Sequence, residues 1–338
     1  MNGLQGTTPG VETGHERGVL LHRALMYGSE RDFTDVAVPY LRAGVKAGDA
    51  VVVITSAANT ALLRGQLGTE AADRIEFIAQ ADWFRAPMQT LADYYDRTRR
   101  DWWPRGRLRL LAEPVWTGFT PLEVREWKRH EAILNVAFAG TPSTIVCAYD
   151  TSTLDAHVIV DAAHTHPELV DGHGARASEH FVDPAEFYAG CNAPPLEPPP
   201  AGAARRPFAS GELPGLRAFL TAEAIRYGLP SDRVLPFVLA VNEVATNIIR
   251  RGGGHGVIWL WAQDGELLCD VADPGRPMED RFLGYLRPRP HQPGSAAMWA
   301  VRLLCHIVEI RSGEHGVLVR MHLKLPRALG AGADGVRG

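Results

Sequence analysis

Hydrophobic and polar positions follow two periods along the chain, and the two periods divide it into strands and helices. Short runs of β-branched and aliphatic residues, such as AVVVIT at 50–55, are typical of strands buried on both faces. Between such runs, apolar residues recur every three or four positions, as they do from Glu30 to Ala47, which predicts amphipathic helices. This alternation continues to residue 148 and predicts βαβ units, with a mainly parallel sheet between two layers of helices. The predicted strands are 18–27, 50–55, 75–78, 108–111 and 143–148, and the predicted helices are 30–47, 59–67, 87–100 and 121–138.

A different order of elements is predicted in the last third of the chain. Residues 191–211 are rich in Pro, Ala and Gly, a composition that resists helix and sheet and predicts a semi-rigid linker between two domains. Beyond the linker, the pattern predicts helices, a hairpin that turns at Asp264-Gly265, a further helix and a last strand pair. The predicted helices are 213–227, one that carries 239–252, and 293–305, and the predicted strands are 256–262, 266–272, 306–311 and 316–325.

The segment LAVNEVATNIIRRG, at 239–252, places Glu243 and Asn247 on one side of a helix. The amide oxygen of Asn247 is a hard ligand that suits Mg²⁺, and the Glu243 carboxylate can orient or deprotonate a nucleophile. Taken alone, the pair is also typical of a solvated helix face. The elements that follow favour a site, because a strand runs into Asp273-Pro274-Gly275 and a Gly/Pro-rich loop then leads to a helix.

In that order these features resemble the GHKL ATP-binding fold of histidine kinases and bacterial anti-sigma-factor serine kinases. The resemblance implies ATP and Mg²⁺ as cofactors, with Asn247 as the Mg²⁺ ligand and Glu243 as the catalytic residue that positions an acceptor hydroxyl. It also implies that Asp273 accepts a hydrogen bond from the adenine amino group, and that Gly275 lets the base approach the backbone.

The chain departs from this family at the second glycine box, which usually reads G-x-G-L. The corresponding residues are Gly294 and Ser295, followed by two alanines, so one glycine survives and the other is replaced by a small residue. Gly294 and Ser295 remain the expected nucleotide contacts. Because phosphoryl transfer depends on positioning and charge neutralisation, the change can impair transfer and leave binding intact. The loop 274–293 stands where a lid would close over ATP.

In the first domain, the candidate ligand-sensing residues follow the predicted strands. Glu113 and Trp116 come after strand 108–111, and Tyr149 and Asp150 come after strand 143–148. Ligands of open parallel sheets bind beyond the carboxyl ends of the strands, so these four side chains are placed to meet one. No G-x-x-x-x-G-K-[ST] motif follows a predicted strand, which excludes a phosphate loop of that type.

Other residues of the first domain favour structural roles. His22 lies near the start of a strand, where a hydrogen-bonded structural histidine is the simpler interpretation. Trp127, Glu131 and Asn135 recur on one side of a predicted helix and either line a pocket or pack in the core. Aromatic residues at helical spacing favour the core.

Five histidines lie close together after the last predicted strand of this domain. The spacing of His164 and His166 is one that a metal ion can use. With no flanking cysteine and no pattern of carboxylates, the segment reads instead as a solvated loop. The five residues are His157, His164, His166, His173 and His180.

Several blocks of the first domain resemble, in order, the MEDS domain, a sensory module of methanogens and methylotrophs. They include HRALMYGSERDF from His22, AEPVWTGFTPLEVREWKRHEAILN from Ala112 and IVCAYDT from Ile145. The resemblance covers residues 18–190 and implies a ligand- or signal-sensing domain with a degenerate RecA-like fold. Together with the GHKL features, it resembles the RsbA family of anti-sigma regulators.

Composition limits the partners and the location. The net charge of −4 and the pI near 6.4 give no electrostatic attraction to nucleic acid or to an anionic membrane. The 4 cysteines lack C-x-x-C spacing, which excludes a disulfide framework and a zinc signature, and three of them are expected to be buried thiols. No apolar run approaches the length of about 18 residues that a membrane span needs, and residues 1–17 lack a signal-peptide core. The sequence therefore predicts a cytoplasmic protein.

These observations predict an α/β chain with a degenerate RecA-like parallel α/β sheet domain and a GHKL (Bergerat) α/β sandwich. The predicted function is an anti-sigma factor whose serine/threonine kinase-like domain is controlled by a sensory domain. Its expected partners are a sigma factor, an anti-sigma-factor antagonist protein, and a small-molecule signal; a homodimer is typical of the family. The alternative is an inactive pseudokinase that binds a partner through protein contacts. The predicted parts are a disordered 1–17, a MEDS-like 18–190, a linker 191–211, a GHKL domain 212–327 and a disordered tail 328–338.

Overall fold

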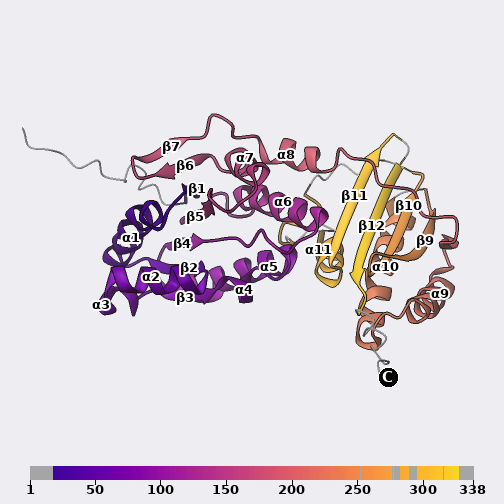
Figure 1. Ribbon diagram of the computed structural model, residues 1–338. Helices are drawn as coiled ribbons and strands as arrows, with labels where there is room; N and C mark the ends of the chain where they lie inside the picture. The colour runs from indigo at the N-terminus through magenta and orange to yellow at the C-terminus, as the bar shows by residue number, and fades with distance from the viewer. Residues whose placement is uncertain are drawn as a thin grey trace, which may run out of the picture. The chain divides into compact units, whose positions relative to one another are not determined.

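The chain divides into two compact units, 1–191 and 192–338. Figure 1 shows both in a computed structural model. The structure describes residues 18–251, 253–275, 277, 282–288, 295–314 and 316–326. The segments expected to be disordered, 1–17 and 328–338, lie outside the described residues. No helix in the described part of the chain combines the length and the hydropathy needed to span a membrane.

A seven-stranded sheet forms the centre of the first unit, in the order β3-β2-β4-β5-β1-β6-β7. Its strands run parallel except β7, which is antiparallel to β6. The predicted mainly parallel sheet is therefore confirmed. The strands are β1 (Leu21–Tyr27), β2 (Ala50–Thr55), β3 (Glu76–Ala79), β4 (Leu108–Ala112), β5 (Ser143–Asp150), β6 (Glu168–Asp171) and β7 (Gly174–Ala177).

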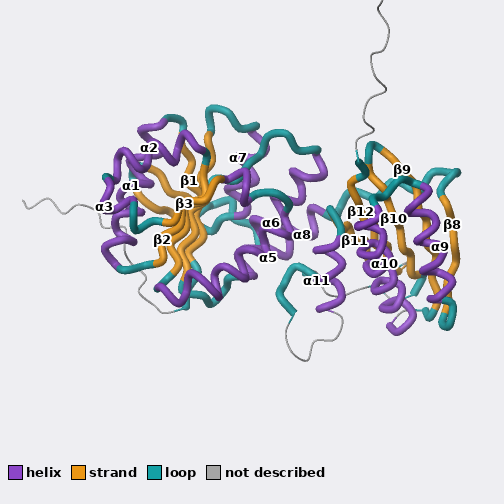
Figure 2. The backbone as a smooth tube through the Cα atoms, turned by 90° about the horizontal axis from the view of Figure 1, so that it is seen from below, coloured by secondary structure: helices purple, strands orange, loops and turns teal. Residues whose placement is uncertain are grey.

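Helices cover both faces of this sheet, as Figure 2 shows. On one face, Phe33 and Leu41 of the first helix pack in a core with Leu25, Val53 and Val146 of the strands. The helices are α1 (Glu30–Ala47), α2 (Ala57–Leu67), α3 (Thr69–Ala72), α4 (Gln80–Trp83), α5 (Pro87–Arg97), α6 (Pro121–Ala137), α7 (Ala156–Thr165) and α8 (Pro184–Cys191). A π-helical turn (Thr98–Trp102) and a 3₁₀ turn (Trp103–Arg105) follow α5.

The histidine-bearing segment after β5 is not the solvated loop that the sequence predicted. It contains α7, β6, β7 and α8, and His166 at the end of α7 is fully buried. The pattern gave a weak signal because α7 is short and buries only Val158, Ala162 and Thr165. These three residues have helical spacing, but two of them are small or polar.

The second unit is a two-layer sandwich. Its five-stranded antiparallel sheet has the order β11-β12-β10-β9-β8, and three helices cover one face, as Figure 2 shows. One apolar core between the layers contains Leu220, Val241 and Val301 of the helices and Cys269 and Met321 of the strands. The predicted α/β sandwich is confirmed. The elements are β8 (Ala204–Ala209), α9 (Leu213–Arg226), α10 (Ser231–Arg251), β9 (His255–Gln263), β10 (Glu266–Asp273), α11 (Ser295–Leu304), β11 (Ile307–Gly313) and β12 (Gly316–Lys324).

The predicted hairpin between β9 and β10 is present. Asp264 and Gly265 both have positive φ, 50° and 75°, which is the geometry of a two-residue turn whose twist matches the strands.

The interpretation of residues 191–211 as a linker is wrong in part, because β8 lies within them and pairs with β9. Phe208 of β8 is 1% exposed and belongs to the apolar core. Composition hid this strand because Pro207 and two arginines are unusual in sheets, but an edge strand tolerates them. The chain before β8 also contacts the sheet, since Arg320 donates to the Glu197 carbonyl (2.6 Å) and Arg311 donates to the Pro194 carbonyl (3.0 Å).

The face of this sheet that lies opposite the helices carries buried ion pairs. Arg320 of β12 binds both carboxylate oxygens of Asp270 at 2.7 Å. His322 contacts Glu266 through Nδ1 (2.9 Å) and Glu309 through Nε2 (3.2 Å). Burial alone would lower the pKa of His322, but the two carboxylates outweigh it and hold that pKa above its ordinary value.

The raised pKa of His322 predicts a pH-dependent stability. A histidine whose folded pKa lies above its unfolded value, about 6.5, stabilises the fold fully below that pH, and the contribution is lost as the pH rises through the folded pKa. His322→Gln should therefore lower the free energy of unfolding more at pH 5.5 than at pH 9. Urea unfolding of both proteins at the two pH values measures this, and an equal loss at both would contradict it.

Gly316 predicts a local steric limit. It has φ +105°, and a Cβ added there would lie 1.9 Å from the Asp273 carbonyl oxygen. Gly316→Ala should lower the free energy of unfolding by about 2 kcal/mol or more, because both the backbone conformation and the contact become strained. Gly313→Ala, at the other end of the same hairpin loop, is the control: nothing lies within 4 Å of its added Cβ, so a loss below about 0.5 kcal/mol is expected.

Candidate functional site

The predicted pair on α10 faces away from the fully buried part of the helix. Val244 and Ala245 are 2% and 0% exposed and pack in the core, whereas Glu243 and Asn247 are half-buried. Neither polar side chain has a hydrogen-bond partner among the residues that the structure describes. Two half-buried polar groups on one side of a helix, both without protein partners, are available to a ligand.

The structure brings the end of β10 to the end of this helix. Asp273 is 5% exposed, and its Oδ1 accepts hydrogen bonds from the backbone N–H of Gly275 (2.8 Å) and of Gly253 (3.4 Å). Gly253 follows α10 closely, six residues after Asn247. No described residue donates to Oδ2 of Asp273, which leaves that oxygen as an acceptor for a ligand.

The predicted glycine box is only partly described. Gly294 lies outside the described residues, and Ser295 is the first residue of α11. Arg302 of α11 contacts the predicted lid, the loop 274–293, at Leu283. It is 2% exposed, donates to the Leu283 carbonyl (2.9 Å) and the Val308 carbonyl (2.7 Å), and lies 3.8 Å from the centre of the Tyr285 ring. The sequence alone did not indicate this role of Arg302.

In the first unit, the Glu113 carboxylate, directly after β4, binds residues at the carboxyl ends of β1 and β2. It accepts hydrogen bonds from the Tyr27 hydroxyl (2.8 Å), the Thr55 hydroxyl, the Ser56 N–H (3.1 Å) and the Asn59 amide (3.0 Å). Burial, followed by the adjacent carboxylate, raises the pKa of Tyr27. Glu113 therefore lies just beyond the carboxyl end of β4, as the sequence predicted, and is occupied by the protein's own donors.

Asp150 is likewise bonded locally, and it ends β5 instead of following it. Its Oδ1 accepts from the N–H (2.9 Å) and the hydroxyl (2.6 Å) of Ser152. Partial burial would raise the pKa of Asp150, but these hydrogen bonds hold it below its ordinary value.

Trp116 and Tyr149, the other two candidates, lie together in the interior. They are 8% and 1% exposed, and their ring centres are 6.0 Å apart. The Tyr149 ring also meets the His166 ring edge-on at 5.6 Å. The Tyr149 hydroxyl and the Trp116 indole N–H are buried without a hydrogen-bond partner in the described part of the chain, which is uncommon for buried polar atoms.

Next to Tyr149 lies a polar cluster that the sequence did not reveal. Its four side chains come from four elements, are 0–3% exposed, and place one ligand-type atom each within 4.8 Å of all the others. Sequence reasoning interpreted each member separately, and only the tertiary fold brings them together. The polar cluster consists of His22 (β1), Glu131 (α6), Cys147 (β5) and His166 (end of α7).

Burial controls the charges in the polar cluster. Burial, with a smaller effect of His22, lowers the pKa of His166 to about 3, so its ring is neutral at physiological pH. Burial and the neighbouring Glu131 raise the pKa of the Cys147 thiol.

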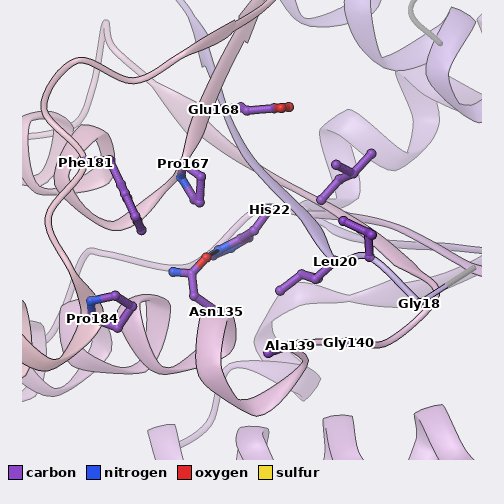
Figure 3. Close-up of a pocket in the computed structure, with 12 residues that line it drawn as sticks. Gly18, Leu20, His22, Asn135, Ala139, Gly140, Pro167, Glu168, Phe181 and Pro184 are labelled. Atoms are coloured by element: carbon purple, nitrogen blue, oxygen red, sulfur yellow. Dashed lines mark hydrogen bonds between the residues drawn. The ribbon is translucent and has the colours of Figure 1, made fainter. Parts of the chain in front are cut away.

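A cavity of about 460 Å³ lies beside this cluster. Figure 3 shows the His22 ring and the Asn135 amide directed at each other. Pro167 and Phe181 also line the cavity. Nδ1 of His22 lies 3.0 Å from Oδ1 of Asn135. His22, a member of the polar cluster, and its partner Asn135 therefore both line the cavity.

Comparisons with known proteins agree with the two units. Residues 21–167 match the family model described as MEDS, the methanogen/methylotroph, DcmR sensory domain. Residues 207–323 match the model of the histidine kinase-like ATPase domain. The chain thus combines an N-terminal MEDS sensory domain with a C-terminal histidine kinase-like ATPase domain, and both predicted resemblances are confirmed.

Two similar solved structures come from a blue-light activated histidine kinase of Erythrobacter litoralis EL346. One aligns at 23% identity over 28% of this chain and 31% of that chain, with a TM-score of 0.23. The other, a histidine kinase domain, aligns at 15% identity over 61% of this chain and 86% of that chain, with a TM-score of 0.25. The chain thus spans about a third of the first of these (31%). No curated protein matches the chain.

Two of the buried tyrosines of the first unit, Tyr27 and Tyr149, give a matched test of its polar contacts. Tyr27→Phe should lower the free energy of unfolding by about 1.5 kcal/mol, because it removes a hydrogen bond to a charged group. Tyr149→Phe should change it by less than about 0.5 kcal/mol or raise it, because the hydroxyl it removes has no described partner. Urea unfolding measures both; an equal loss in the two variants would show that the Tyr149 hydroxyl is bonded.

Proposed function

We propose that the second unit binds ATP with Mg²⁺, and that the first unit controls it in response to a small-molecule signal. The observation that carries the proposal is the position of Asp273. Its buried carboxylate accepts from one backbone N–H just after α10 (Gly253) and one just after β10 (Gly275), while its second oxygen has no donor among the described residues. Such an acceptor suits the amino group of adenine.

Glu243 and Asn247 supply the polar side of the same site. The Asn247 amide oxygen would ligate Mg²⁺, and the Glu243 carboxylate would position an acceptor hydroxyl. Gly275 lies beside Asp273 and lets the base approach the backbone, and Gly294 with Ser295 would meet the phosphates at the start of α11. The match to histidine kinase-like ATPase domains supports this assignment.

We further propose that the chain is an anti-sigma regulator that transfers phosphate to a serine or threonine of a partner. The expected partner is a sigma factor or an anti-sigma-factor antagonist protein, with no direct binding of nucleic acid, and the expected location is the cytoplasm. The net charge of −4 supports a protein partner over a polyanion. The order of the two domains supports signal-controlled regulation, and the protein is expected to work as a homodimer.

Calorimetry of ATP binding tests the nucleotide site. Wild-type protein should bind ATP more tightly with Mg²⁺ than without it, and Asn247→Ala should remove the Mg²⁺-dependent gain. Asp273→Asn should weaken binding about 10- to 100-fold, because a hydrogen bond to a charged group contributes about 1.5–3 kcal/mol. Asn242→Ala is the control, since the Asn242 side chain on the same helix is already bonded to Arg217 (3.1 Å).

The outcomes separate binding from transfer. If wild-type protein fails to bind millimolar ATP, the nucleotide proposal is wrong and a module that binds its partner by protein contacts remains. If ATP binds but no phosphate reaches a purified antagonist protein, the kinase proposal is wrong and a nucleotide-binding pseudokinase remains. Glu243→Gln should keep ATP affinity within about twofold and abolish transfer, because Glu243 acts on the acceptor hydroxyl.

A further inference from the structure

We propose that the polar cluster of the first unit binds one divalent transition-metal ion, and that zinc fits it best. The four candidate ligands are two imidazoles, a carboxylate and a thiol, all buried. This proposal concerns the first unit alone and does not depend on ATP binding by the second.

Four of the six distances in the cluster match the edges of a tetrahedron around zinc. Oε2 of Glu131 lies 3.7 Å from Nε2 of His22, 3.6 Å from Nε2 of His166 and 3.5 Å from Sγ of Cys147. Nε2 of His22 lies 3.5 Å from Sγ of Cys147. Zinc bonds of about 2.0–2.3 Å at tetrahedral angles place ligand atoms about 3.3–3.6 Å apart. These four pairs therefore need shifts of only a few tenths of an ångström, and the other two pairs, His166 with His22 and His166 with Cys147, lie within 4.8 Å.

The hydrogen bonds of Asn135 fix the tautomer of His22. The Asn135 amide nitrogen donates to the carbonyls of Ala132 (3.2 Å) and Thr165 (2.8 Å), so its oxygen is the atom that faces His22. Because this oxygen can only accept, Nδ1 of His22 carries the proton. Nε2 of His22 then directs a lone pair into the cluster.

His166 is prepared in the same way. Its Nδ1 donates to the Ala162 carbonyl (2.8 Å), so Nε2 bears a lone pair. This Nε2 is buried and has no hydrogen-bond partner among the described residues. A backbone or amide oxygen that holds the outer nitrogen of each imidazole is the usual outer shell of a metal-binding histidine.

A bound cation would stabilise the buried carboxylate and the lone pairs that face it in the cluster. Without one, two imidazole lone pairs face a buried carboxylate oxygen, and among the four side chains only the Cys147 thiol has a proton to donate to it. Metal binding releases that thiol proton to solvent, which leaves a thiolate and a carboxylate around a doubly charged ion. The charges of +2, −1 and −1 then cancel, and a neutral centre is much less costly to bury than a lone carboxylate.

The donor set also selects the type of ion. Mg²⁺ and Ca²⁺ take oxygen ligands, and only one of the four side chains offers oxygen. Two nitrogens, one sulfur and one oxygen at tetrahedral spacing suit zinc, which has no competing geometric preference. Because all four positions are filled by protein, the arrangement is that of a closed site, which ties β1, β5, α6 and α7 together.

The test uses the purified full chain. Elemental analysis should find about one zinc per chain, and chelator-treated protein should take up one Co²⁺ with the intense visible absorption of a tetrahedral ion and a near-ultraviolet thiolate-to-cobalt band. Cys147→Ser should abolish the thiolate band. Asn135→Ala should weaken Co²⁺ binding about 10- to 100-fold, because it removes only the outer-shell contact.

Two control variants keep the test specific. His164 lies two residues before His166, and Cys191 is the other cysteine of the first unit; neither belongs to the cluster, so His164→Gln and Cys191→Ala should bind Co²⁺ as the wild type does. The proposal is overturned if folded wild-type protein shows neither zinc nor a tetrahedral Co²⁺ spectrum at millimolar metal, or if Cys191→Ala removes the thiolate band while Cys147→Ser keeps it. The wild-type metal content and Co²⁺ spectrum alone can refute the metal proposal, so the test does not depend on every variant folding.

Discussion

The carboxamide of Asn135 is the contact on which the interior of the first unit depends. It donates to α6 itself and to the last turn of α7, and it accepts from His22 on β1. One side chain thus sets how a helix, a strand and a second helix end meet, and the orientation of its amide sets which nitrogen of His22 faces inward. Asn135 also lines a cavity, so a ligand bound there would contact the residue that connects β1, α6 and the end of α7.

In the second unit, apolar packing stabilises one face of the sheet and buried ion pairs stabilise the other. The face under the helices is apolar, and the polar site around Asp273 lies at its edge, where β10 and α10 end. The opposite face is held by Arg320 with Asp270 and by His322 with two glutamates. The candidate nucleotide site therefore lies at the border of a rigid core, with its own carboxylate held by backbone groups.

Local patterns predicted the fold well and the interior chemistry poorly. The alternation of apolar residues located most strands and helices, and the Asp264-Gly265 turn followed from residue type alone. Glu243 and Asn247 could be paired because they lie four residues apart on one helix. The polar cluster could not be found in this way, because its members lie on four elements separated by up to 144 positions (His166 against His22). The β8 strand was missed because its pairing partner, and not its composition, determines its conformation.

The position of Pro207 bears on how this sheet behaves towards other chains. β8 is an edge strand, and an edge normally offers a row of free backbone groups to an incoming strand. Proline has no N–H to offer, and Arg205 and Arg206 beside it add charge that opposes flat, dry stacking. The β8 edge therefore disfavours the addition of a strand from another copy, whether in an aggregate or in strand exchange.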